Sequence, residues 1–115
     1  MPTANVYCRD AETGSALSAL APKLKAHLAH ALSCGAIALS PDEVSVRIIN
    51  VTDGTAMMAQ VEAEVTAFAY PERVTRQDEL SRGCASFISE NLPAQPTVEV
   101  WLILAELGHS YTMPG

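Results

Sequence analysis

One hydropathy pattern occurs in both halves of the chain, and this repeat constrains the fold more than any other feature. The segment EVSVRIINVTDG at 43–54 can be laid over TVEVWLILAELG at 97–108, so that Val44 matches Val98 and both segments end in glycine. Identities are few, but the hydropathy and the position of the turn agree. An internal duplication of this kind predicts a fold made of two copies of one supersecondary unit.

Four segments have the alternating or β-branched pattern that is typical of strands. In the first, Ala4, Val6 and Cys8 alternate with more polar neighbours, and the polar stretch RDAETGS follows. The predicted strands are 3–8, 44–51, 60–70 and 98–107. TDGT at 52–55 is predicted to be a turn, and GHSYTMPG a short tail.

Two helices are predicted between these strands, because apolar residues there recur with a period of 3.6. In the first helix, Pro22 indicates that the most regular part starts near Ala21, and Gly35 looks like its stop signal. In the second, Thr75 followed by Asp78 resembles a capping box at the start of the helix. The periodic positions are Leu17, Leu20, Leu24, Leu28 and Leu32, then Leu80, Cys84, Phe87, Ile88 and Leu92.

The order of elements is therefore strand, helix, strand, twice over. Each unit has a right-handed crossover, which makes its two strands parallel and places its helix on one face of the sheet. We expect an α/β fold: one domain over 1–115, with pseudo-repeats at about 2–53 and 60–107, in which a four-stranded mixed sheet carries two helices on one face. The other face would be open to water in a monomer, and Trp101 there suggests that neighbouring subunits cover it. Residues expected on this face are Arg47, Ile49, Glu62, Glu64, Glu99, Trp101 and Ile103.

Composition argues against several classes of partner. The formal net charge is −6, with a pI near 4.8 and only 7 Lys and Arg, so neither nucleic acid nor an anionic membrane is an expected partner. No apolar run reaches the roughly 20 residues of a membrane span, and the start lacks a secretion signal, so we expect a cytoplasmic protein. Cys8, Cys34 and Cys84 have no zinc-like spacing and are interpreted as reduced structural thiols.

The whole chain resembles the tautomerase superfamily, on a combination of short motifs. PTANVYCRD, with proline second and a strand after it, matches the family start, and SVRIIN is similar to the second-strand arginine motif of oxalocrotonate tautomerases, which carries over to Arg47. Within the superfamily the chain most resembles carboxymethyl-hydroxymuconate isomerases, through VYCRD, ALSCGAI, PERVTRQDE and AELGHSYT. Oxalocrotonate tautomerases also place an arginine after the first strand, where this chain has Arg9 a few residues early and Glu12 near the expected position.

This resemblance implies a cofactor-independent isomerase that binds no metal and acts on a small anionic enol or keto acid, as in the degradation of aromatic compounds. It implies a homotrimer of duplicated β-α-β units, with Pro2 as the catalytic base. Arg47 would bind the substrate carboxylate, and Arg73 would supply a second cationic group in the second repeat. His109 and Tyr111 lie in the tail after the fourth strand, where they could border the pocket of a neighbouring subunit.

The chemistry of Pro2 depends on Met1. While Met1 is attached, the proline nitrogen is an amide and cannot accept a proton. A free α-amino group titrates at about pH 8, and both burial and a nearby arginine would lower the pKa of a Pro2 amine. Such a base works best with a pKa near the operating pH. We expect Met1 to be removed, because small residues after methionine usually permit it.

Other interpretations remain open at several residues. Arg47 could form an intersubunit ion pair with Glu62, Glu64 or Glu99 instead of holding substrate. Arg73 and Arg76 could simply be solvated, while His27 and His30 look like a solvated helix face and not a metal site. For the whole protein, the alternatives are a non-catalytic trimeric binding protein of the same fold, or a decarboxylase or dehalogenase that uses the same proline.

Overall fold

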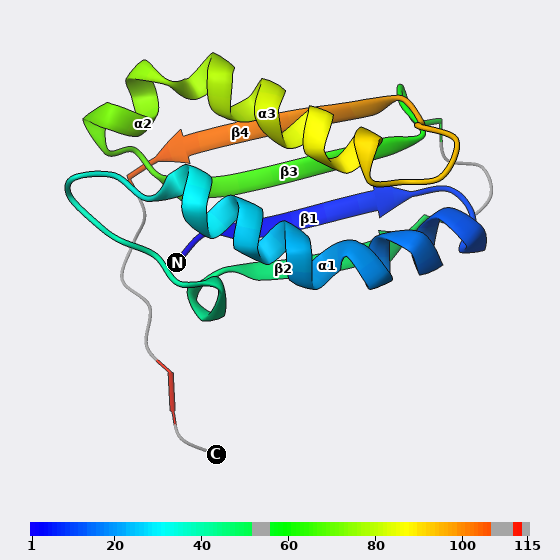
Figure 1. Cartoon of the computed structure of the whole chain (residues 1–115), viewed down its shortest axis with the longest axis horizontal. Helices are drawn as coiled ribbons and strands as arrows, with labels where there is room; N and C mark the ends of the chain where they lie inside the picture. The colour runs from blue at the N-terminus through cyan, green and yellow to red at the C-terminus, as the bar shows by residue number, and fades with distance from the viewer. Residues whose placement is uncertain (52–55, 107–111, 114–115) are drawn as a thin grey trace.

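The computed structural model describes residues 1–51, 56–106 and 112–113. Two β-α-β units follow one another along the chain (Figure 1). The elements are β1 (Thr3–Cys8), α1 (Ala11–Leu32), the 3-10 turn η1 (Pro41–Glu43), β2 (Ser45–Asn50), β3 (Val61–Phe68), α2 (Pro71–Thr75), α3 (Gln77–Glu90) and β4 (Val98–Ala105). None of the helices in this described part is long and apolar enough to cross a membrane.

The four strands form one mixed sheet in the order β2-β1-β3-β4. β1 and β2 are parallel, β3 and β4 are parallel, and the two units meet through the antiparallel central pair β1 and β3. In the register, Thr3 lies between Ser45 of β2 and Thr66 of β3. The expected α/β architecture is therefore confirmed.

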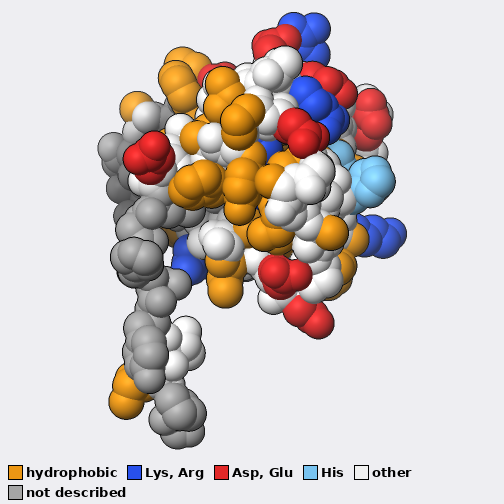
Figure 2. Space-filling view, turned by 90° about the vertical axis from the view of Figure 1, so that its left-hand side faces the viewer, with side chains coloured by type: hydrophobic (Ala, Val, Ile, Leu, Met, Phe, Trp, Pro, Cys, Tyr) orange, Lys and Arg blue, Asp and Glu red, His pale blue; other side chains and the backbone are white. Residues whose placement is uncertain are grey.

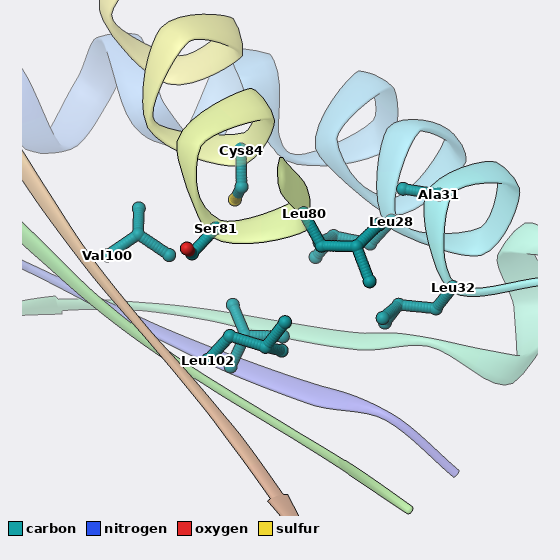
Figure 3. A pocket seen from close by; sticks show the side chains of 9 residues that line it. Leu28, Ala31, Leu32, Leu80, Ser81, Cys84, Val100 and Leu102 are labelled. Atoms are coloured by element: carbon teal, nitrogen blue, oxygen red, sulfur yellow. The ribbon is translucent and has the colours of Figure 1, made fainter. Parts of the chain in front are cut away.

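Both long helices cover the same face of the sheet (Figure 1). Alternation in the central strands explains why: every second residue of β1 and β3 is buried against α1 and α3. The buried strand residues are Ala4, Val6, Cys8, Val61, Ala63, Val65 and Ala67, and all belong to one hydrophobic core with the periodic residues of the helices. Between α1, α3 and β4 the packing leaves a small apolar hollow, into which Leu28, Leu80 and Leu102 point (Figure 3).

The first helix, α1, is continuous from Ala11 to Leu32. Asp10 caps α1, because its carboxylate accepts a hydrogen bond of 2.7 Å from the backbone N–H of Thr13, and this bond lowers the pKa of Asp10. Pro22 lies inside the helix, on its exposed side. Ser18, whose carbonyl loses its helical donor, is exposed as well, so water can satisfy that carbonyl. Pro22 therefore does not mark the start of the regular part of the helix, as had been predicted, because α1 runs through it.

The start of the second helix was also predicted wrongly. Thr75 and Asp78 form no capping box, since Thr75 Oγ1 donates to the carbonyl of Pro71 within the short helix α2. Helix α3 then begins at Gln77 after a break at Arg76. The expected strand 60–70 is also shorter in the structure. It ends at Phe68, because the chain turns there and α2 begins at Pro71.

The sheet face away from the helices is open, as expected. Trp101 on the edge strand β4 is 60% exposed and Ile103 is 43% exposed, while Arg47 is exposed on β2 at the opposite edge of the sheet. In the part of the chain described, a hollow on this face is lined by Tyr7, Val51, Ala56, Met57, Glu62, Glu64 and Trp101. Large apolar side chains thus stand beside carboxylates on an uncovered surface.

Candidate active site

Pro2 stands at the start of β1 and is buried, whereas Met1 is 77% exposed. The carbonyl of Pro2 accepts a hydrogen bond of 3.1 Å from the N–H of Ser45, which fixes the proline against the first residue of β2. Continuing the register by one position places Pro2 between Val44 and Ala67. Loss of Met1 would therefore leave an amine at a fixed, largely enclosed position.

Arg47 lies on the open face, level with Asn5 of β1. Its Nη1 donates a hydrogen bond of 3.2 Å to Asn5 Oδ1, and its side chain is exposed. The ion pairs within the described ranges both lie near the start of α3, so no carboxylate of those residues pairs with Arg47. A free guanidinium of this kind can accept a carboxylate with two hydrogen bonds.

Two of the glutamates weighed as partners of Arg47 are already engaged. Glu64 accepts a hydrogen bond of 2.8 Å from the hydroxyl of Tyr7, and this carboxylate raises the pKa of Tyr7. Glu62 accepts hydrogen bonds from the backbone N–H groups of Met58 and Ala59. The carboxylates of β3 are therefore held within their own chain.

Arg73 is 3% exposed, and its guanidinium is hydrogen-bonded to backbone carbonyls. Its Nε donates a hydrogen bond of 2.8 Å to the carbonyl of Leu32 at the end of α1, and its Nη1 donates one of 3.0 Å to the carbonyl of Phe68 at the end of β3. The guanidinium carbon also lies 4.9 Å from the centroid of the Tyr70 ring. Arg73 thus contacts the helix layer, while Arg47 occupies the opposite face, so the structure does not bring the two arginines together.

An aromatic pair beside Pro2 was missed by the sequence analysis. Phe68 and Tyr70 lie with ring centroids 4.9 Å apart, at an interplanar angle of 54°. The register places Phe68 next to Met1, one position beyond the pair of Pro2 and Ala67. Two aromatic residues at alternate positions, at the end of a predicted strand and just before PERV, were the available signal.

The remaining candidates are less informative. His109 and Tyr111 lie outside the described residues, as does the predicted turn at 52–55. His27 stacks on Phe87 with ring centroids 4.5 Å apart, between the two long helices. No group of three metal-ligating side chains exists among the residues described, so neither His27 nor His30 belongs to such a group there.

The apolar hollow between the helices does not look like a reactive site. Besides Cys84, its lining includes a single polar side chain, that of Ser81 (Figure 3). Burial raises the pKa of the Cys84 thiol to about 12, so this cysteine stays protonated and unreactive. The hollow belongs to the hydrophobic core.

Comparison with solved structures identifies proteins of the same fold. The macrophage migration inhibitory factor-like protein of Entamoeba histolytica is 8% identical, with 96% of each chain covered and a TM-score of 0.67. A fused 4-OT symmetric trimer is 16% identical, with 90% of this chain and 85% of that chain covered and a TM-score of 0.68. N1, a member of the cis-3-chloroacrylic acid dehalogenase family, is 14% identical, with 90% of this chain and 75% of that chain covered and a TM-score of 0.64.

No protein-family model matches the chain, and no curated protein matches it. At identities of 8 to 16%, the structural matches establish the fold shared with these proteins.

Proposed function

We propose that this chain is a cofactor-independent tautomerase of small enol carboxylates, similar to the carboxymethyl-hydroxymuconate isomerases, in which the amine of Pro2 acts as general base and acid. The observation that carries the proposal is the placement of Pro2: it is buried at the start of a central strand, next to the exposed Met1. The shared fold with a dehalogenase-family protein, 4-OT and a macrophage migration inhibitory factor-like protein supports it.

In the proposed reaction, the neutral Pro2 amine accepts the proton of the substrate's enol hydroxyl. The electrons of that O–H bond form the carbonyl, and the electrons of the carbon–carbon double bond take a proton from the Pro2 ammonium at the distal carbon. Enol and keto forms have the same atoms, so no oxidant, metal or cofactor is required. The buried position of Pro2 favours the neutral amine that begins this cycle.

Arg47 holds the substrate carboxylate in this proposal and stabilises negative charge that develops on the dienolate. Arg47 is level with Asn5, three residues along β1 from Pro2, which is about 10 Å at the rise of a strand. It also lies on the face away from the helices. A substrate that reaches Pro2 would meet the arginine of a neighbouring copy more readily than that of its own chain.

A homotrimer is therefore part of the proposal. The exposed Trp101 and Ile103 give the open face an apolar surface to bury, and one protein of the same fold is a symmetric trimer. Arg73 enters as a residue that holds the backbone near Pro2, because both Nε and Nη1 are bound to carbonyls. His109 remains a predicted pocket residue.

The test begins with a mass measurement that verifies a protein starting at Pro2. This protein should ketonise phenylenolpyruvate or 2-hydroxymuconate, followed by ultraviolet absorbance, and a form with glutamate inserted before Pro2 should be inactive because its proline nitrogen is an amide. Pro2→Ala should lower kcat by on the order of 10²- to 10⁴-fold. Arg47→Ala should lower kcat/KM by roughly 10- to 100-fold, mainly through KM.

Mixing inactive subunits tests whether sites are shared. Pro2→Ala and Arg47→Ala chains that are unfolded together and refolded should regain part of the wild-type activity, whereas either alone should not. Absence of turnover by the verified Pro2 protein would favour the non-catalytic binding protein. Release of halide from 3-chloroacrylates without tautomerase activity would favour the dehalogenase alternative, which the structural match to N1 makes worth assaying.

A further inference from the structure

The end of β3 carries an aromatic side chain at the mouth of the proposed site. Phe68 is the last residue of β3 and is 38% exposed. Continuing the register of β1 and β3 by two positions brings Phe68 opposite Met1, so the end of β3 borders the nitrogen that removal of Met1 would free. The Phe68 ring is therefore a candidate contact for a substrate bound at this nitrogen.

The Phe68 ring belongs to a stack of three groups in which the two aromatic rings are tilted by 54° to one another. It packs on Tyr70 at a centroid distance of 4.9 Å, and the other partner of Tyr70 is the guanidinium of Arg73, also at 4.9 Å. Arg73 in turn binds the carbonyl of Phe68 itself. Backbone and ring are thus fixed by the same buried arginine, so the stack presents a preformed surface.

The surroundings of this stack are apolar. Figure 2 views the molecule from the end where β1 begins and β3 and β4 finish, and hydrophobic side chains cover its middle while most of the acidic and basic ones stand at the margin. Apolar residues that are exposed in this region of the chain include Met1, Phe68 and Val74. A planar, uncharged group would fit beside such a surface better than a second carboxylate.

We propose that Phe68 and Tyr70 form an aromatic wall that binds the planar apolar end of the substrate, with Arg73 as the positioning residue of this wall. The inference rests on the proposed function and deepens it: the preferred substrates are aryl-substituted enol carboxylates, in which the ring lies on Phe68 and the carboxylate on Arg47. Offset or tilted stacking between the two rings adds to the burial of apolar surface. Dicarboxylates such as hydroxymuconates gain no such contact.

The experiment compares two substrates in the protein verified to begin at Pro2. The ratio of kcat/KM for phenylenolpyruvate to that for 2-hydroxymuconate should fall about 10-fold in Phe68→Leu, through KM for the aryl substrate. Phe87→Leu is the matched control, because Phe87 stacks on His27 between the helices, and it should leave the ratio unchanged. An unchanged ratio in Phe68→Leu would overturn the wall.

Arg73→Lys tests the positioning role. Lysine keeps the charge but lacks the planar fork with which Arg73 binds two carbonyls while lying over the Tyr70 ring. In this variant the ratio of the two kcat/KM values should fall while the trimer content stays unchanged. A purely structural role would lower kcat/KM equally for both substrates and leave the ratio intact. Equal losses would therefore remove Arg73 from the proposal.

Binding separates this inference from the proposed function. The dissociation constant of trans-cinnamate should be about 10-fold lower than that of sorbate, measured by calorimetry, and Phe68→Leu should abolish the difference. A protein without turnover that still binds cinnamate through Phe68 would keep the wall and refute the tautomerase. Turnover of both substrates with no effect of Phe68 on rate ratio or binding would do the reverse.

Discussion

Arg73 and Leu32, 41 positions apart in the chain, are joined by a hydrogen bond of 2.8 Å from the guanidinium Nε to the last carbonyl of α1. Glu72 makes a second link between side chain and backbone: its carboxylate accepts a hydrogen bond of 2.9 Å from the N–H of Gly35. Two neighbouring residues of α2 therefore hold the end of α1 and the loop after it. The two β-α-β units are tied together at the end of the sheet that carries Pro2.

Removing Arg73 should destabilise the protein clearly. Arg73→Leu leaves the carbonyls of Leu32 and Phe68 without these donors, and the expected loss is roughly 2–4 kcal/mol in the free energy of unfolding, measured in urea. Arg76→Gln is the matched control, because its ion pair with Glu79 is exposed, and its unfolding midpoint should stay at the wild-type value. Equal effects of the two substitutions would mean that the buried bonds of Arg73 contribute nothing.

Two helical glycines should respond oppositely to alanine. A Cβ on Gly14 would lie 2.6 Å from Asn50 Oδ1, whereas a Cβ on Gly83 would have nothing within 4 Å. Gly83→Ala should stabilise the protein by about 0.5–1 kcal/mol, since alanine is the better helix former. The free energy of unfolding of Gly14→Ala should be at least about 1 kcal/mol lower than that of Gly83→Ala.

A double-mutant cycle identifies the cause at Gly14. Asn50 also accepts a hydrogen bond of 2.6 Å from the Cys8 thiol, so it cannot rotate away without losing that contact. In an Asn50→Ala background, Gly14→Ala should regain the stabilising effect of Gly83→Ala. Additive free energies in the cycle would show that the side chain of Asn50 is not the obstacle.

His27 should make stability depend on pH. Burial, followed by the nearby His30, lowers the pKa of His27, and its Nε2 is buried without a hydrogen-bond partner. The unfolded state therefore binds the proton more readily than the folded state. The contribution of neutral His27 to the free energy of unfolding is fully present above the unfolded pKa of about 6.5 and is lost as the pH falls below it. The slope for one proton is at most about 1.4 kcal/mol per pH unit.

Substituting either histidine tests this assignment. The difference in unfolding free energy between wild type and His27→Leu should change between pH 7 and pH 5, measured in urea. His30→Gln should keep most of the wild-type dependence, because burial is the larger cause of the shift at His27. A pH profile that His27→Leu leaves unaltered would contradict the assignment.

A charge on the open face should disrupt assembly. Trp101→Glu places a carboxylate beside Glu64, its partner in the register, and on the surface that the proposed trimer buries. The sedimenting species should change from trimer to monomer in analytical ultracentrifugation. Val74→Glu, at a 51% exposed position on α2, is the control and should leave the trimer intact. A trimeric Trp101→Glu would place the interface elsewhere.

The alternation of apolar residues was enough to predict the strands, the shared helix face and the open face with Arg47 and Trp101. Helix boundaries were less predictable, because the carbonyl freed by Pro22 is tolerated only on an exposed side of α1, and exposure depends on the tertiary structure. The place of Arg73 depends on carbonyls of Leu32 and Phe68, which sequence spacing does not bring together. The aromatic pair beside Pro2 likewise follows from the register of β1 with β3.

The duplicated architecture also determines how many reactive amines one chain can hold. β3 begins at the opposite end of the sheet from β1, and the residue before it is Gln60, which exchanges two hydrogen bonds of 3.1 Å with Thr97. The nitrogen of Gln60 lies within the continuous chain and is permanently an amide. The scaffold has approximate twofold symmetry, but the proposed chemistry uses only one of the two equivalent positions. Titration with a tight inhibitor should therefore reach its end point at one equivalent per chain, and thus three per trimer.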